Sequence, residues 1–171
     1  MNNQYCRVKH YIIAVIFIAA GVFLDQITKY FALIRLKDRE PYIIIKDVFH
    51  LEYLENRGAA FGLFQNQRIF FFCSVAVICM AVIWFYMHVP MEKRYFPLRA
   101  CAVLIVSGAF GNFIDRVRLN YVVDFFYFKL IDFPIFNVAD IFVTVAAFLL
   151  FLLLCFYYKE EELERILHSG K

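Results

Sequence analysis

The sequence predicts an all-α integral membrane protein, with four transmembrane helices and a small β-sheet cradle at the outer membrane surface. Of the 171 residues, 63% are hydrophobic and the mean hydropathy is +0.65, whereas about half of a soluble domain is apolar. Four apolar blocks are long enough to cross a bilayer, which takes about 20 residues. The chain is short enough to form one domain, residues 1–171. Its net charge of +3 is too small to indicate nucleic acid as a partner.

The first apolar block runs from about Tyr11 to Ile34 and predicts a transmembrane helix that the protein retains. Basic residues precede it, as in a secretory signal peptide, but the block is longer than the apolar core of such a peptide. Asp25 and Lys29 also stand where a cleavage site would be expected. Because they are four positions apart, these two residues share a helix face and can form an ion pair. The pair either only neutralises itself or also holds neighbouring polar groups.

The long connection after the first block predicts two short strands, Tyr42–Ile45 and Val48–Leu54, because both are rich in β-branched and aromatic residues. We expect these strands to form a small sheet on the membrane surface, where aromatic residues are favoured. The segment Asn56-Arg57-Gly58-Ala59-Ala60-Phe61 follows. Its glycine permits close backbone approach, and its asparagine can both donate and accept hydrogen bonds. Taken alone, the segment is typical of an ordinary turn.

The other three apolar blocks predict the remaining transmembrane helices. They run from about Ile69 to His88, from Leu98 to Ile114 and from Val138 to Tyr158. Basic residues lie before the first block, between the second and third, and after the fourth, which indicates the cytoplasmic side. Both termini are then cytoplasmic. The end of the third block, the start of the fourth and the connection 35–68 meet at the outer face.

The third block ends in the polar segment Gly111-Asn112-Phe113-Ile114-Asp115-Arg116. Small residues near this end allow close helix packing. Packing alone, however, does not require Asn112, Asp115 and Arg116 at the same end of a helix. Two roles are open for Arg116: it neutralises Asp115, or it holds a carbonyl group of a substrate.

Two aspartates stand beside apolar residues on either side of a short aromatic-rich loop. They are Asp124, in Val122-Val123-Asp124-Phe125, and Asp140, in Phe136-Asn137-Val138-Ala139-Asp140. Asn137 could cap the fourth helix, and Asp140 alone would suit a first helical turn. A carboxylate next to hydrocarbon is costly and therefore rare unless it is paired or takes part in chemistry. Two such carboxyls close together share one proton, so the pair predicts an aspartyl hydrolase.

Five segments, taken in chain order, form a specific pattern. They are Asp25-Gln26-Ile27-Thr28-Lys29, Asn56-Arg57-Gly58-Ala59-Ala60-Phe61, Gly111-Asn112-Phe113-Ile114-Asp115-Arg116, Val122-Val123-Asp124-Phe125 and Phe136-Asn137-Val138-Ala139-Asp140. Together they resemble the signature segments of the bacterial lipoprotein signal peptidases, also called signal peptidase II. The resemblance covers nearly the whole chain.

The resemblance implies an aspartyl endopeptidase of the bacterial cytoplasmic (inner) membrane, with its active site near the outer face. It would remove signal peptides from prolipoproteins, cutting just before a cysteine that carries a diacylglyceryl group. The implied partners are these diacylglyceryl-modified prolipoproteins, membrane lipids and inhibitors of the globomycin type. No metal or other cofactor is implied.

Roles for individual residues also follow from the resemblance. Asp124 and Asp140 match the catalytic dyad. The polar residues that line the site in this family correspond here to Asn56, Asn112, Arg116 and Asn137. The supporting residues correspond to Asp25, Lys29, Gly58 and Asp115.

A second class of function is a small transporter or proton-coupled carrier that uses intramembrane acids as a relay. The acids, however, cluster towards one side, and the sequence lacks the internal inverted repeat of many transporters. The four histidines are scattered, and no cysteine pair has zinc-ligand spacing with a histidine. The sequence therefore favours a metal-free hydrolase.

Overall fold

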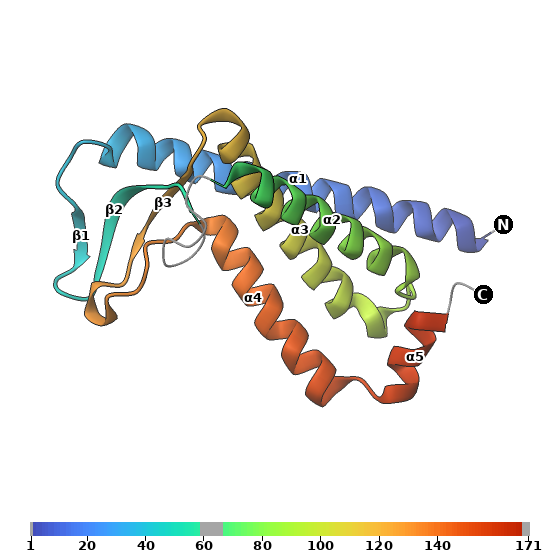
Figure 1. The fold of residues 1–171 in the computed structure, drawn as a ribbon. Helices are drawn as coiled ribbons and strands as arrows, with labels where there is room; N and C mark the ends of the chain where they lie inside the picture. Colours follow the sequence, from blue (N-terminus) through green and yellow to red (C-terminus); the bar gives the residue numbers. More distant parts are fainter. Residues whose placement is uncertain (1, 59–66, 169–171) are drawn as a thin grey trace.

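The computed structural model describes residues 2–58 and 67–168 and confirms the predicted fold class. The four long helices lie in a bundle, with a three-stranded sheet at one end and both the start of α1 and α5 at the other (Figure 1). The long helices are α1 (Asn2–Leu36), α2 (Arg68–His88), α3 (Phe96–Arg118) and α4 (Val138–Leu152). Each of them, with its adjoining turns, is long and apolar enough to cross a membrane.

Helix α3 is the centre of the bundle and packs against α1, α2 and α4. Two glycines permit this packing: a Cβ at Gly108 would overlap the carbonyl group of Ala139, and a Cβ at Gly111 would overlap the Asp25 carboxyl. Small residues have this role between membrane helices. The helix extends beyond the predicted block Leu98–Ile114, because the polar side chains at its end find partners inside the protein.

The sheet is antiparallel, in the order β1 (Tyr42–Ile45), β2 (Phe49–Asn56) and β3 (Val122–Tyr127). The first two strands confirm the prediction, with β2 running on to Asn56. β3 was not predicted as a strand, since residues 122–125 are all buried and show no alternation of exposed and buried positions. The register places Leu54 opposite Asp124 and Asn56 opposite Val122. The sheet therefore brings Asn56 and Asp124 close together.

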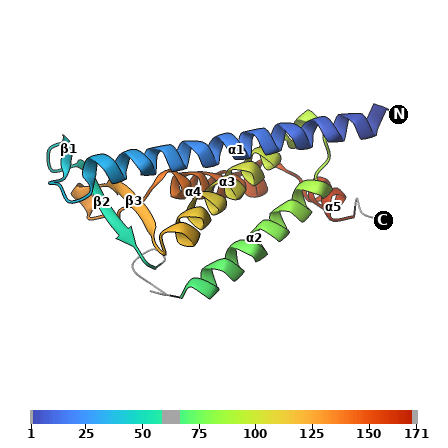
Figure 2. The same cartoon turned by 90° about the horizontal axis from the view of Figure 1, so that it is seen from above.

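The opposite end of the bundle is closed by the last part of the chain. After α4 come a π-helical turn, η4 (Leu153–Tyr157), and the short helix α5 (Glu160–His168). Elsewhere in the chain, a single 3-10 turn, η2 (Lys93–Tyr95), precedes α3, and another, η3 (Lys129–Ile131), follows β3. Leu163 and Ile166 of α5 pack against a buried cluster that includes Val89, Leu98 and Tyr158. Seen from above, α2 diverges from α1 towards the sheet end (Figure 2).

Candidate active site

The two predicted aspartates come from different elements at the sheet end of the bundle. Asp124 lies in β3 and is almost completely buried, and Asp140 lies in the first turn of α4. The side chain of Asn137 accepts a hydrogen bond from the backbone N–H of Asp140 at 3.0 Å, and the Asp140 carboxyl accepts one from the backbone N–H of Asn137 at 3.1 Å. This reciprocal cap confirms the predicted capping role of Asn137 and fixes the direction of the Asp140 carboxyl.

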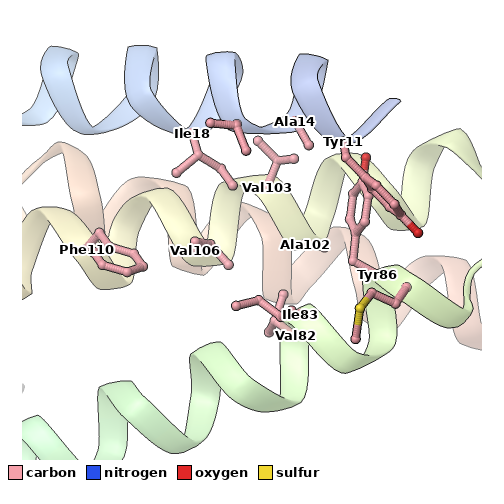
Figure 3. Close-up of a pocket in the computed structure, with 12 residues that line it drawn as sticks. Tyr11, Ala14, Ile18, Val82, Ile83, Tyr86, Ala102, Val103, Val106 and Phe110 are labelled. Atoms are coloured by element: carbon pink, nitrogen blue, oxygen red, sulfur yellow. The ribbon is translucent and has the colours of Figure 1, made fainter. Parts of the chain in front are cut away.

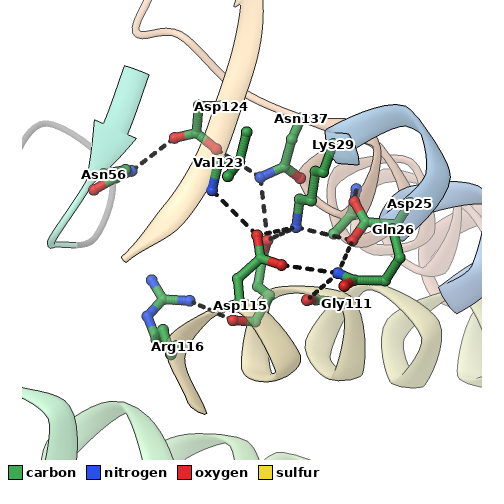
Figure 4. Close-up of polar contacts among 12 residues, drawn as sticks. Asp25, Gln26, Lys29, Asn56, Gly111, Asp115, Arg116, Val123, Asp124 and Asn137 are labelled. Carbon is green, nitrogen blue, oxygen red and sulfur yellow. Dashed lines mark hydrogen bonds and ion pairs between the residues drawn. The ribbon is translucent and has the colours of Figure 1, made fainter. Parts of the chain in front are cut away.

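Two asparagine side chains connect the two carboxyl groups. Asn137 Nδ2 donates to Asp124 Oδ1 at 2.6 Å and also to Asn112 Oδ1 at 3.1 Å. Asn112 Nδ2 in turn donates to Asp140 Oδ1 at 2.8 Å. Asn56 adds a second donor to Asp124, with Nδ2 at 2.9 Å from Oδ2 (Figure 4). The arrangement links groups from β2, α3, β3 and α4 in one hydrogen-bonded chain.

The orientation of each of these amides is fixed by a group that can only donate a hydrogen bond. The Lys29 ammonium donates to Asn112 Oδ1 at 2.8 Å, so the NH₂ of Asn112 faces Asp140. The backbone N–H of Gly58 donates to Asn56 Oδ1 at 2.9 Å, and the cap interaction orients Asn137 in the same way. All three amides therefore present their donors to the aspartates.

A buried group of charged side chains on α1 and α3 lies next to this chain of amides. Lys29 Nζ lies 2.8 Å from Asp25 Oδ2 and 3.1 Å from Asp115 Oδ2, and all three side chains are buried. The predicted pair of Asp25 and Lys29 is therefore confirmed, and its contacts with Asp115 and Asn112 favour the second interpretation, in which it also holds neighbouring polar groups. Gln26, which sequence reasoning did not single out, donates to Asp115 Oδ1 at 2.9 Å and to the carbonyl of Gly111 at 3.1 Å.

The same carboxylates hold the backbone on which the two candidate aspartates stand. Asp115 Oδ2 accepts a hydrogen bond from the backbone N–H of Val123 at 3.1 Å, one residue before Asp124. Asp25 Oδ1 accepts one from the backbone N–H of Ala139 at 2.9 Å, one residue before Asp140. The buried charges thus position both β3 and the start of α4. Spacing along α1 or α3 alone does not reveal these contacts, because their partners are far away in the sequence.

Arg116 directs its guanidinium towards carbonyl groups at the edge of the site. It donates to the carbonyl of Gly58 at 3.0 Å and to that of Asn112 at 3.3 Å, and it lies over the Phe71 ring, 4.2 Å from the centroid. From the sequence, Arg116 was one possible partner for the Asp115 carboxylate. In the structure, Asp115 forms its ion pair with Lys29 instead. Arg116 ties the segment after β2 to α3.

Burial raises the pKa of Asp124 from 3.8 to about 7, and repulsion by the Asp140 carboxylate is the next largest cause. The hydrogen bonds from Asn56 and Asn137 act in the opposite direction and lower this pKa. A carboxyl with a pKa near neutrality holds its proton for much of the time at pH 7 and can donate it. Two neighbouring carboxyls, of which one is protonated, are equipped for general acid–base chemistry.

The structure brings every predicted site residue into this one region: Asp25, Lys29, Asn56, Gly58, Asn112, Asp115, Arg116, Asp124, Asn137 and Asp140. Residues 59–61 of the second signature segment lie outside the described residues. Within residues 2–58 and 67–168, no group of three or more histidine, cysteine, aspartate or glutamate residues is arranged to hold a metal ion.

Comparisons with known proteins agree with this arrangement. The family model described as Signal peptidase (SPase) II matches residues 16–156. The chain is 40% identical to the lipoprotein signal peptidase of Clostridium tetani over 153 residues, covering 88% of this chain and 95% of that protein. It is 46% identical to the lipoprotein signal peptidase of Caldanaerobacter subterraneus over 144 residues, covering 84% and 96%.

The fold is also similar to a solved structure of a bacterial membrane enzyme. The TM-score is 0.75 and the identity is 30%, with 86% of this chain and 92% of that chain covered. The family match and the curated relatives extend over most of the chain, and all five signature segments lie in sequence order within it. The chain therefore belongs to the signal peptidase II family, the membrane aspartic peptidases that cleave signal peptides from prolipoproteins.

Proposed function

We propose that Asp124 and Asp140 are the catalytic dyad of this chain, and that it cuts prolipoproteins just before a cysteine that carries a diacylglyceryl group. The observation that carries this proposal is the pair of amides, Asn137 and Asn112, that joins the two carboxyls. Fixed donors hold both carboxyls towards the same region without neutralising them, as a shared-proton dyad requires.

The raised pKa of Asp124 supports a mechanism in which this residue holds the first proton. In the attack step, the Asp140 carboxylate takes a proton from water, the water oxygen bonds to the scissile carbonyl carbon, and Asp124 donates its proton to the carbonyl oxygen. In the second step, Asp140 gives its proton to the leaving nitrogen, and Asp124 regains a proton from a hydroxyl of the intermediate as the C–N bond breaks. Atoms and charges balance, and the dyad returns to its starting state.

The other polar residues have positioning roles in this proposal. Asn56, Asn112 and Asn137 orient the dyad, and Arg116 holds the Gly58 segment beside it. Asp25, Lys29 and Asp115 hold the backbone on which the dyad stands. The whole chain, residues 1–171, acts as a single domain.

We place the dyad near the outer face of the bacterial cytoplasmic (inner) membrane, with both termini in the cytoplasm. Basic residues gather at the end of the bundle opposite the sheet, among them Arg94 in η2, Arg99 in the first turn of α3, and Lys159 after η4. Short loops rich in such residues stay in the cytoplasm. Reporter fusions after Lys159 or near Lys93 are expected to be cytoplasmic, and a fusion near Asp47 external. A cytoplasmic reporter at Asp47 contradicts this orientation.

The lipid part of the substrate supplies much of its affinity in this proposal. Each CH₂ group moved from water into the bilayer contributes about 0.8 kcal/mol, so diacylglyceryl chains keep the precursor at the membrane, with its scissile bond at interfacial depth. Membrane lipids surround the helices, and a cyclic peptide of the globomycin type that places a hydroxyl between the aspartates would inhibit cleavage.

The direct test is cleavage of one lipid-modified precursor by the purified protein and by two variants, Asp124→Asn and Asp140→Asn. Each variant keeps the shape of the side chain but removes a proton donor or acceptor, which contributes about 10²- to 10⁴-fold to such reactions. Asp132→Asn is the control, because Asp132 is exposed and its contact is with Tyr127. Near-normal cleavage by either dyad variant would rule out this assignment.

A further inference from the structure

An apolar groove of about 420 Å³ lies between α1 and α2, with α3 as its floor (Figure 3). It is separate from the polar site, and its lining is apolar apart from tyrosines at one end. The lining includes Ala14 and Ile18 of α1, Val82 of α2, and Ala102, Val106 and Phe110 of α3. The small side chains of Ala14 and Ala102 leave this space open between helices that otherwise pack on α3.

The two ends of the groove differ. At the end away from the sheet, the rings of Tyr11 and Tyr86 meet with centroids 5.9 Å apart, and the Tyr86 hydroxyl donates to the carbonyl of His10 at 3.3 Å. These contacts join α1 to α2 and close that end. At the other end, the helices diverge towards the sheet (Figure 2).

A row of aromatic side chains continues from the groove towards the dyad. Phe110 lines the groove and contacts Phe113 at a centroid distance of 6.3 Å, and Phe113 contacts Phe72 at 5.3 Å. The neighbouring Phe71 lies under Arg116. Phe110 also comes two residues before Asn112, about 3 Å along the helix axis. The apolar surface thus begins directly beside the hydrogen-bonded site.

We propose that this groove binds one acyl chain of the diacylglyceryl group of the substrate and so places the scissile bond at the dyad. The inference rests on the proposed function, which puts a diacylglyceryl-bearing cysteine next to the scissile bond. On α3 the lining runs from Phe110 to Ala102, so the far end of the groove lies about 15 Å from Asn112 at 1.5 Å per residue. That length is half of the roughly 30 Å hydrocarbon core, the depth reached by an acyl chain of one leaflet.

The signal-peptide helix is a poorer match for the same space. A helix with side chains is about 10 Å wide, and a spanning segment is about 30 Å long, so it needs on the order of 2,000 Å³. The groove provides about 420 Å³ and is closed at the end through which a spanning helix would have to pass. A single chain of methylene groups fits both its volume and its closed end.

The first test asks which lipid occupies the groove. A non-cleavable lipopeptide with a photoreactive group near the end of one acyl chain is bound to the full chain in nanodiscs and irradiated. We expect labelling at Val82, Val103 or Val106, which unlabelled lipopeptide competes away. Equally strong labelling by a photoreactive phospholipid that the lipopeptide does not displace would assign the groove to a bilayer lipid and overturn the proposal.

The second test fills the groove and varies the acyl chain length. Val82→Phe and Ala14→Leu each place extra carbons in the groove, and their matched controls on the same helices are Val77→Phe and Ala20→Leu, whose side chains are exposed outside it. For a precursor with 16-carbon chains, we expect each filling variant to raise KM about tenfold, the low end of the effect of one methylene in an apolar pocket. For a precursor with four-carbon chains, KM should match that of the wild type.

Different results would contradict the proposed function and the acyl-chain assignment. If the wild-type protein cleaves no lipid-modified precursor, the proposed function fails. If it cleaves the precursor, but the filling variants and their controls behave alike at both chain lengths, only the acyl-chain assignment is wrong. A KM increase that is the same for both chain lengths also overturns it, because such an increase reflects a structural defect and not loss of chain binding.

Discussion

The two ends of the helix bundle handle charge in opposite ways. At the sheet end, Lys29 is buried with Asp25 and Asp115, and these groups hold protein segments far apart in sequence. At the other end, Arg94 pairs with Glu162 on the protein surface, with Nε 3.0 Å from Oε1. Buried ion pairs are strongly coupled to the fold, whereas exposed ones contribute little. The comparison predicts that equal chemical changes have very different effects at the two ends.

The sheet end also holds more carboxyl groups than cations close to the site. Lys29 and Arg116 lie among four carboxyl groups, those of Asp25, Asp115, Asp124 and Asp140. In the proposed mechanism, Asp124 and Asp140 are the two acids that are left for chemistry. Neutral amides, which orient the carboxyls without cancelling their charge, are suited to this arrangement.

The largest effect is expected for Lys29→Met. Removing the cation leaves two buried carboxyls unpaired, and breaking a buried pair in this way typically destabilises a protein by about 3–5 kcal/mol. The variant also loses the donor that orients Asn112 towards Asp140. We expect a lower thermal unfolding midpoint in detergent and loss of cleavage at temperatures where the variant is still folded.

The matched control is Lys37→Met, the same change in a more exposed pair with Glu55. We expect it to cleave at a rate close to that of the wild type. Lys29→Arg separates charge from geometry, since it keeps the cation but not the compact ammonium that Asp25 and Asp115 share. Similar stability of Lys29→Met and Lys37→Met would contradict the contrast between the two kinds of pair.

A smaller and more specific effect concerns the pH dependence of cleavage. Burial raises the pKa of Asp124 from 3.8 to about 7, so the proton that Asp124 donates in the proposed mechanism is lost as the pH rises through about 7. We expect kcat/KM to fall above this pH, by up to about tenfold per unit. The raised pKa also favours the folded state at pH below about 3.8, and that contribution is lost as the pH rises through 7.

The variant Asn56→Ala tests whether Asp124 causes this loss of activity at high pH. The hydrogen bond from Asn56 lowers the pKa of Asp124, so its removal should slow cleavage and shift the loss of activity to higher pH. The control Asp132→Asn should leave the pH profile unchanged. A wild-type rate that stays constant from pH 6 to pH 9 would show that Asp124 is not the proton donor.

Much of the fold was predictable because it follows from local patterns. Apolar length indicated the four helices, and β-branched and aromatic runs indicated β1 and β2. Helical spacing also indicated the pair of Asp25 and Lys29. Family membership leaves the alternative of a transporter without support.

The remaining features depend on contacts between distant segments, which no local pattern reveals. β3 reads as a buried apolar run because both of its faces are covered, and only its pairing with β2 makes it a strand. The pair of Lys29 and Asp115 exists because Gly111 lets α1 and α3 approach closely. No local pattern predicts the role of Gln26, since its partners Gly111 and Asp115 lie on another helix.

The smallest effect is expected at the end opposite the sheet, for Glu162→Gln. The hydrogen bond from Arg94 lowers the pKa of Glu162 from 4.5 to about 2, so any contribution of the pair to folding is present at neutral pH and is lost as the pH falls from about 4.5 through about 2. Because the pair is solvent-exposed, we expect the thermal midpoint to fall by less than about 2 °C at pH 7. Ile166→Ala, on the same helix, removes a buried side chain and should cost about 2–5 kcal/mol. Equal losses for the two variants would mean that the surface pair, and not apolar packing, holds α5 in place.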